Sequence, residues 1–207
     1  MKVILIAIVL FQPLIIFGQN VFVKKVNNED KAHLVIGIKK GDSTDWYFAG
    51  CSFKSVALLP DTTKIRLIGD LLDFTADTIM CDNIIFNLSG RYTVIRKQPL
   101  SRQYNLQIDA LILINYIALS SKAFYYSPYP LLYDKETEKE ICCNSEGLNT
   151  VIAIYKNWYL ELKQNGFSDY FYPLYDKRYE WFAGKFKQQK FKDYPRWDNF
   201  FDCKEIE

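Results

Sequence analysis

Apolar residues follow two patterns along this chain, and each pattern predicts a different kind of element. In the first hundred positions they alternate with polar residues over short stretches such as 32–40 (AHLVIGIKK), which is typical of strands with one buried face. Beyond position 100 they recur every three or four positions over longer stretches, which is typical of helices. We therefore predict an α+β fold, in which an antiparallel sheet from roughly 21–97 packs against helices drawn mainly from 103–187.

The predicted sheet contains two hairpins. Turn-forming residues at 41–45 separate the strands of the first, and a Ser-Gly pair at 89–90 separates those of the second. Between the hairpins, helical spacing predicts a helix that opens at Asp61 or Thr62 and ends at Asp73. The expected strands, in chain order, are 21–26, 32–40, 46–51, 83–88 and 91–97.

The stretch 103–120 is the most apolar part of the chain beyond its start, and its periodicity fits both a strand and a helix. It is longer than an ordinary strand and contains neither Gly nor Pro, so we predict a helix with Ser101 as its N-cap. Apolar residues on nearly every side of this helix indicate burial on nearly every side. Asp109 is the exception, and we expect it on the one face that meets water, because an unpaired buried carboxylate is costly; the alternative is a buried partner.

Aromatic residues gather in the C-terminal half. The stretch 124–130 is rich in tyrosine and holds two prolines, which exclude a helix there and favour extended backbone. After it we predict a short strand at 131–133, a charged hairpin tip at 135–140, and a helix from Asn144 or Ser145 to Asn165 that Gly166 ends. The last predicted helix covers 176–187.

The N-terminus has the pattern of a secretion signal. A lysine at position 2 precedes an apolar run that Gln12 and Pro13 interrupt, and the small residue Gly18 follows. The run is short for a membrane span, so we predict a signal peptide over 1–18, cleavage after Gly18 and a single domain over 19–207; an uncleaved anchor is the alternative. The expected location is periplasmic or extracellular, with no stable transmembrane segment after cleavage.

Charge and reactive residues narrow the function classes. With 26 basic and 24 acidic residues the net charge is +2, which argues against a nucleic-acid partner. Five cysteines and one histidine have no metal-ligand spacing, so we expect neither a metal nor a cofactor. No catalytic constellation surrounds His33, which we interpret as structural. In an oxidising compartment a Cys51–Cys81 disulfide is expected, since each residue borders a predicted strand.

These observations favour a non-catalytic binding or interaction module of the cell envelope, whose partner is an envelope protein or a glycan. Tyrosine combines a broad apolar face with a polar tip, which suits protein interfaces and sugar stacking. A glycan-directed hydrolase with paired carboxylates is one alternative. A toxin-neutralising or structural envelope protein is the other. No catalytic residues are assigned, and the expected binding residues are Tyr125, Tyr126, Tyr129, Tyr133 and Asp109.

Overall fold

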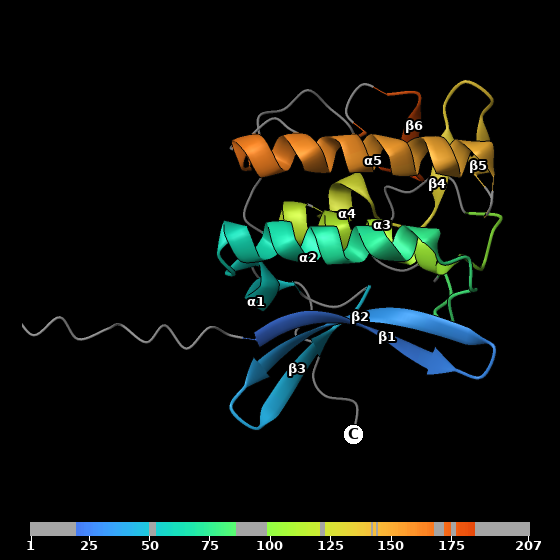
Figure 1. Cartoon of the computed structure of the whole chain (residues 1–207). Coiled ribbons are helices and arrows are strands. Elements are labelled where there is room, and N and C mark those ends of the chain that lie inside the picture. The colour runs from blue at the N-terminus through green and yellow to red at the C-terminus, as the bar shows by residue number, and fades with distance from the viewer. Residues whose placement is uncertain are drawn as a thin grey trace, which may run out of the picture.

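Two small antiparallel sheets and a set of helices make up the described part of the chain, so the predicted α+β class is confirmed (Figure 1). In Figure 1 the first sheet lies at the bottom, α2 and α3 cover it, and α5 forms the top layer. The structure is a computed structural model that describes residues 20–49, 53–85, 99–120, 123–141, 143, 145–167, 172–174 and 177–184.

The first sheet has the strand order β1-β2-β3, with β1 at Asn20–Asn28, β2 at Lys31–Lys40 and β3 at Ser43–Tyr47. All neighbours are antiparallel, as predicted for the first hairpin. Leu34, Ile36 and Ile38 point to the helices and are buried, because alternate side chains of a strand share a face. Of the predicted second hairpin, residues 86–98 lie outside the described residues, and 83–85 belong to no strand.

Helix α2 spans Asp61–Asp73, as predicted, and follows the short helix α1 at Lys54–Ala57; a 3₁₀ turn, η1, continues it over Phe74–Ala76. Its N-cap is Pro60, which makes no side-chain cap bond. The apolar side of α2 buries Leu67, Ile68, Leu71 and Leu72.

Helix α3, Leu106–Leu119, is the predicted central helix, and every residue of it except Ala118 is buried. It begins later than predicted. Asn105 is the N-cap, and its side-chain oxygen accepts a hydrogen bond from the Ile108 amide at 3.2 Å. Ser101 was the wrong cap because its amide and hydroxyl both donate to the Glu140 carboxylate. Within the described ranges, no helix has the length and apolar character to cross a membrane.

The C-terminal half forms a second sheet with the order β5-β4-β6. Its strands are β4 at Leu132–Asp134, β5 at Lys139–Ile141 and β6 at Tyr179–Trp181. The predicted helix over 176–187 is therefore wrong at its described core. Residues 179–181 pair with β4, and the Phe182 amide donates to the Leu131 carbonyl at 2.7 Å. An open strand edge favours pairing over a helix that its own residues support only weakly.

Two further helices complete the fold. Helix α5 spans Glu146–Asn165, with Ser145 as N-cap and Gly166 at a φ of 70°, which confirms the predicted boundaries. Helix α4, Ala123–Tyr126, was not predicted, and the expected extended backbone over its residues is wrong. Proline restricts the residue directly before it, here Ser127, and places no such limit on the turn further upstream.

A buried chain of hydrogen bonds links the second sheet to α5 and to the central helix α3. The Trp181 indole donates to the Tyr155 hydroxyl at 2.9 Å, and that hydroxyl donates to the Asn115 side-chain oxygen at 2.7 Å. The three residues come from β6, α5 and α3. This chain fixes the second sheet against the central helix, because breaking any link would leave a buried polar group unpaired.

Candidate functional site

The tyrosines that were expected to form an exposed binding surface mostly lie in the core. Tyr126 is 5% exposed and Tyr129 only 1%, so neither side chain belongs to an exposed surface. The Tyr129 ring packs edge-to-face on Phe182, which follows β6 of the second sheet, at 5.8 Å. Tyr133 on β4 is half-buried against the same phenylalanine. The side chain of Tyr125, in α4, lies outside the described set.

Asp109 also differs from its expected position, because it is fully buried and no part of it meets water. Its carboxylate accepts the backbone amide of Leu34 at 2.8 Å. β3 pairs with β2 only from Ile36 onward, so the Leu34 amide has no strand partner, and Asp109 supplies the missing acceptor. Burial raises the pKa of Asp109 to about 7, although the hydrogen bond from Leu34 acts to lower it. Asp109 is therefore part of the framework.

The surroundings of Asp109 are polar and partly charged. His33 and Asp82 form a pair, with His33 Nδ1 2.9 Å from the Asp82 carboxylate. Next to them lies Cys81, which is buried and has a free thiol, contrary to the expected disulfide; its expected partner, Cys51, lies outside the described residues. Burial raises the pKa of the Cys81 thiol to about 12, which leaves it protonated and unreactive. A cysteine–histidine mechanism has no thiolate here.

A hollow of about 430 Å³ opens elsewhere, between the second sheet and the first turn of α5. Strand register brings Tyr179, Asp134 and Lys139 into one row across the three strands, on the face turned toward α5. The wall opposite is the first turn of α5, which Ser145 caps by accepting the Leu148 amide at 3.2 Å. We call this space the α5 hollow, and its lining residues are Asp134, Thr137, Lys139, Glu140, Ile141, Ser145, Glu146, Gly147, Arg178 and Tyr179.

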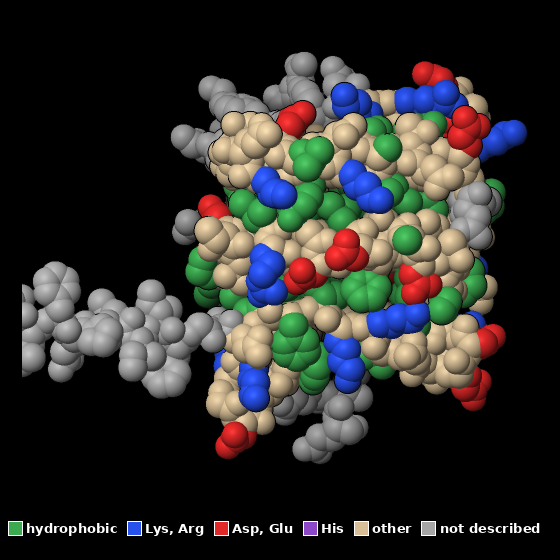
Figure 2. Space-filling view, in the orientation of Figure 1, with side chains coloured by type: hydrophobic (Ala, Val, Ile, Leu, Met, Phe, Trp, Pro, Cys, Tyr) green, Lys and Arg blue, Asp and Glu red, His purple; other side chains and the backbone are tan. Residues whose placement is uncertain are grey.

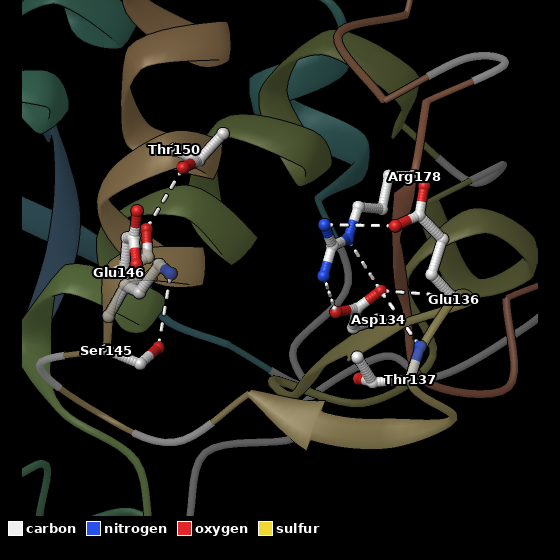
Figure 3. A network of polar contacts seen from close by, with 8 residues as sticks. Asp134, Glu136, Thr137, Ser145, Glu146, Thr150 and Arg178 are labelled. Atoms are coloured by element: carbon white, nitrogen blue, oxygen red, sulfur yellow. Dashed lines mark hydrogen bonds and ion pairs between the residues drawn. The ribbon is translucent and has the colours of Figure 1, made fainter.

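Asp134 and Arg178 make a network of hydrogen bonds and ion pairs in the α5 hollow (Figure 3). The guanidinium donates to both Asp134 oxygens, at 2.9 and 2.5 Å, and also contacts Glu136 at 3.0 Å. The amides of Glu136 and Thr137 add hydrogen bonds to the same carboxylate. The Arg178 bond holds the pKa of Asp134 well below its usual range, so this carboxylate stays ionised and fixed in place.

The other residues that line the α5 hollow are partly acidic and partly aromatic. Glu140 uses both carboxylate oxygens to accept the amides of Leu100 and Ser101, at 2.6 and 2.9 Å. Figure 3 shows Ser145 and Glu146 in the first turn of α5, across the view from the Asp134–Arg178 pair. On the sheet side, the Arg178 guanidinium lies over the Tyr179 ring at 5.3 Å. The α5 hollow thus combines fixed acceptors, hydroxyl groups and an aromatic ring.

This arrangement suits binding better than acid–base chemistry. A general acid must hold a proton to give, and Asp134 is kept ionised by its arginine. Glu140 already accepts three hydrogen bonds from the 100–101 segment. Among the described residues, no group of three or more His, Cys, Asp or Glu side chains is arranged to hold a metal ion. Preorganised polar groups around a partly apolar floor are typical of ligand sites.

Most residues that line the α5 hollow could not be identified from the sequence. Asp134 follows the predicted strand at 131–133 and carried no further signal, and Ser145 was expected only as a helix cap. Arg178 and Tyr179 lay within a predicted helix, so their pairing with β4 could not be foreseen. The separation of 44 positions between Asp134 and Arg178 carries no local signal.

Known proteins provide no further identification. No protein-family model matches the chain, and neither a curated protein nor a solved structure is similar to it.

Proposed function

We propose that this protein is an exported, non-catalytic binding module of the cell envelope and that the α5 hollow is its ligand site. The supporting observation is the fixed Asp134–Arg178 pair, which opposes the first turn of α5 across a space of about 430 Å³. A site whose polar groups are already held in place loses little entropy when a ligand binds.

The charges of the α5 hollow favour a saccharide that is neutral or carries an amino group. Three carboxylates and two cations line it, which leaves a slight acidic excess. Arg178 is already neutralised by Asp134 and Glu136 and has little attraction left for an anion. Carboxylate oxygens accept hydrogen bonds from sugar hydroxyls, and the Tyr179 ring offers a face to the apolar side of a sugar.

A glycan-directed hydrolase receives less support from the same geometry. Its mechanism needs one carboxyl group that donates a proton and a second that acts as base or nucleophile. Asp134 is held ionised, and Glu140 is occupied by backbone amides. Asp109, whose pKa is raised, is buried away from the α5 hollow.

Gly147 allows a direct test of the α5 hollow. A Cβ at this position would meet Ile141 and Tyr179 at 3.5–3.6 Å, which is ordinary contact, so Gly147→Ala should fold with a stability change below about 1 kcal/mol. Gly147→Leu projects further and should fill part of the hollow. We expect a glucose or glucosamine disaccharide to shift amide NMR signals of 139–141 and 178–180 in the wild type and Gly147→Ala, and to bind Gly147→Leu at least about tenfold more weakly.

The alanine variant is the matched control, because it changes the same position without filling the space. Equal binding by all three proteins would show that the ligand lies elsewhere. Shifts that cluster away from the α5 hollow would have the same meaning. Release of monosaccharide during the titration would instead favour the hydrolase.

Export is tested separately by the mass of the protein recovered from the envelope or the medium. We expect the mass of residues 19–207, because the charged start, apolar run and small residue at Gly18 form a signal-peptide pattern. A recovered mass that still includes 1–18 would contradict cleavage. Recovery from the cell interior alone would contradict export.

A further inference from the structure

The outer face of the first sheet carries aromatic and basic side chains. Strand register places Phe22, Gly37 and Trp46 in one row across β1, β2 and β3, on the side away from the buried Leu34, Ile36 and Ile38. We call this the aromatic row. The Trp46 side chain is 44% exposed. Its ring meets the Phe22 ring edge-on at 5.7 Å.

Gly37 is the reason that the aromatic row lies close to the sheet. A Cβ at this position would come within 2.7 Å of the end of the Phe22 ring, so the ring occupies space that any other residue would fill. Phe22 therefore leans across β2 instead of standing out from it. A ring in this position offers a low, broad apolar surface and does not protrude.

Lysines border the aromatic row on both sides along the strands. Lys39 lies one alternation beyond Gly37, and Lys24 lies one alternation beyond Phe22, each about 7 Å along its strand. Lys24 also approaches the Trp46 ring, with its ammonium 5.5 Å from the ring centre. Lys31 lies on the same face at the start of β2, next to the β1–β2 turn, which contributes the acids Glu29 and Asp30. Figure 2 views the molecule from the side, with the first sheet at the bottom, and several Lys and Arg side chains and a hydrophobic one are visible there.

Acidic side chains do not balance these lysines within the three strands. β1 and β2 contain no Asp or Glu, and the single acid of β3, Asp45, pairs with Ile38 on the inner face and binds Lys40 at 2.6 Å. Asp82 lies next to the sheet, and its carboxylate contacts the His33 ring. The outer face of these strands thus carries a surplus of positive charge around an aromatic surface.

We propose that this outer face binds an acidic polysaccharide, with the aromatic row stacking on sugar rings and Lys24, Lys31 and Lys39 pairing with carboxylate or sulfate groups. An aromatic row with cations on either side matches a sugar ring whose neighbours along the chain carry anions. A bilayer would be met by protruding aromatic tips, whereas Phe22 leans along the sheet. An acidic peptide would satisfy the lysines and leave the rings without a role. This site is independent of the α5 hollow.

The test measures affinity by calorimetry with four probes: a galacturonic acid hexamer, a neutral glucose hexamer, polyglutamate and anionic phospholipid vesicles. We expect the galacturonate hexamer to bind most tightly, and more weakly as salt rises. The double variant Lys24→Gln/Lys39→Gln should lose about tenfold in affinity, and Trp46→Ala about fivefold, while Trp46→Phe keeps most of it. The matched control, Lys156→Gln/Lys163→Gln, removes the same charge from α5 and should bind normally.

Three results would overturn the proposal. Polyglutamate that binds as tightly as the hexamer, with no effect of Trp46→Ala, would indicate attraction by charge alone. Vesicle binding without hexamer binding would identify a lipid surface. An equal loss in the α5 control would indicate a nonspecific effect of net charge. Normal hexamer binding by Gly147→Leu is expected and keeps this test separate from that of the α5 hollow.

Discussion

Replacing Asp109 by asparagine should stabilise the protein at pH 8 by up to about 4 kcal/mol and should have little effect near pH 4. Burial raises the pKa of Asp109 from 3.8 to about 7, a shift of about three pH units. Between these values the folded state keeps a proton that the unfolded chain has released. The stability of the wild type therefore falls as pH rises from about 4 to about 7 and levels off above it.

Asparagine removes this pH dependence because it is neutral and its side-chain oxygen can still accept the Leu34 amide. Urea unfolding at several pH values measures the difference. Asp109→Leu is the control, since it removes the acceptor and should cost about 1–3 kcal/mol relative to Asp109→Asn at every pH. If Asp109→Asn is no more stable than the wild type at pH 8, the neighbouring His33 and Tyr104 stabilise the charged carboxylate more than burial destabilises it.

Tyr129→Ala should destabilise the protein by about 3–5 kcal/mol, as much as a core substitution such as Ile114→Ala, for which about 2–5 kcal/mol is expected. Both side chains are almost fully buried, and Tyr129 packs on Phe182. Loss of a buried ring removes its transfer energy and leaves a cavity. Either change is a large share of the stability usual for a domain of this size.

Tyr129→Phe is the matched control, because it keeps the ring and removes only the hydroxyl. We expect it to lose less stability than Tyr129→Ala in urea unfolding followed by circular dichroism. A loss below about 1 kcal/mol for Tyr129→Ala would mean that the ring contributes little to the core. The earlier interpretation of this loop as a recognition surface would then regain its support.

Elements whose signals are local were predictable from the sequence. Helix α5 has a cap, an apolar stripe and a terminating glycine, and the first hairpin has clear alternation on either side of its turn. Helix α3 was recognisable by length alone, but its start was not. Ser101 and Asn105 are both acceptable caps, and the choice depends on Glu140, almost forty positions away.

Features that depend on distant partners could not be predicted. β6 is three residues long and forms because β4 leaves an edge open, so its sequence alone suggested a helix. The position of Asp109 depends on where β3 stops, which no local pattern encodes. Tyrosine content did not show whether the stretch is buried or exposed, because aromatic residues fill a core as readily as they form an interface.

The carboxylate of Asp109 also decides how far the first sheet can grow. An unpaired strand edge is a template on which another chain can add, which leads to aggregation. Beyond the end of β3, the Leu34 amide of β2 donates to the Asp109 carboxylate. The Ala32 amide donates to the Met80 carbonyl, and the Ala32 carbonyl accepts the Asp82 amide. A side chain and a short crossing segment thus close this edge without a further strand, and they protect β2, the longest strand among the described residues, from intermolecular pairing.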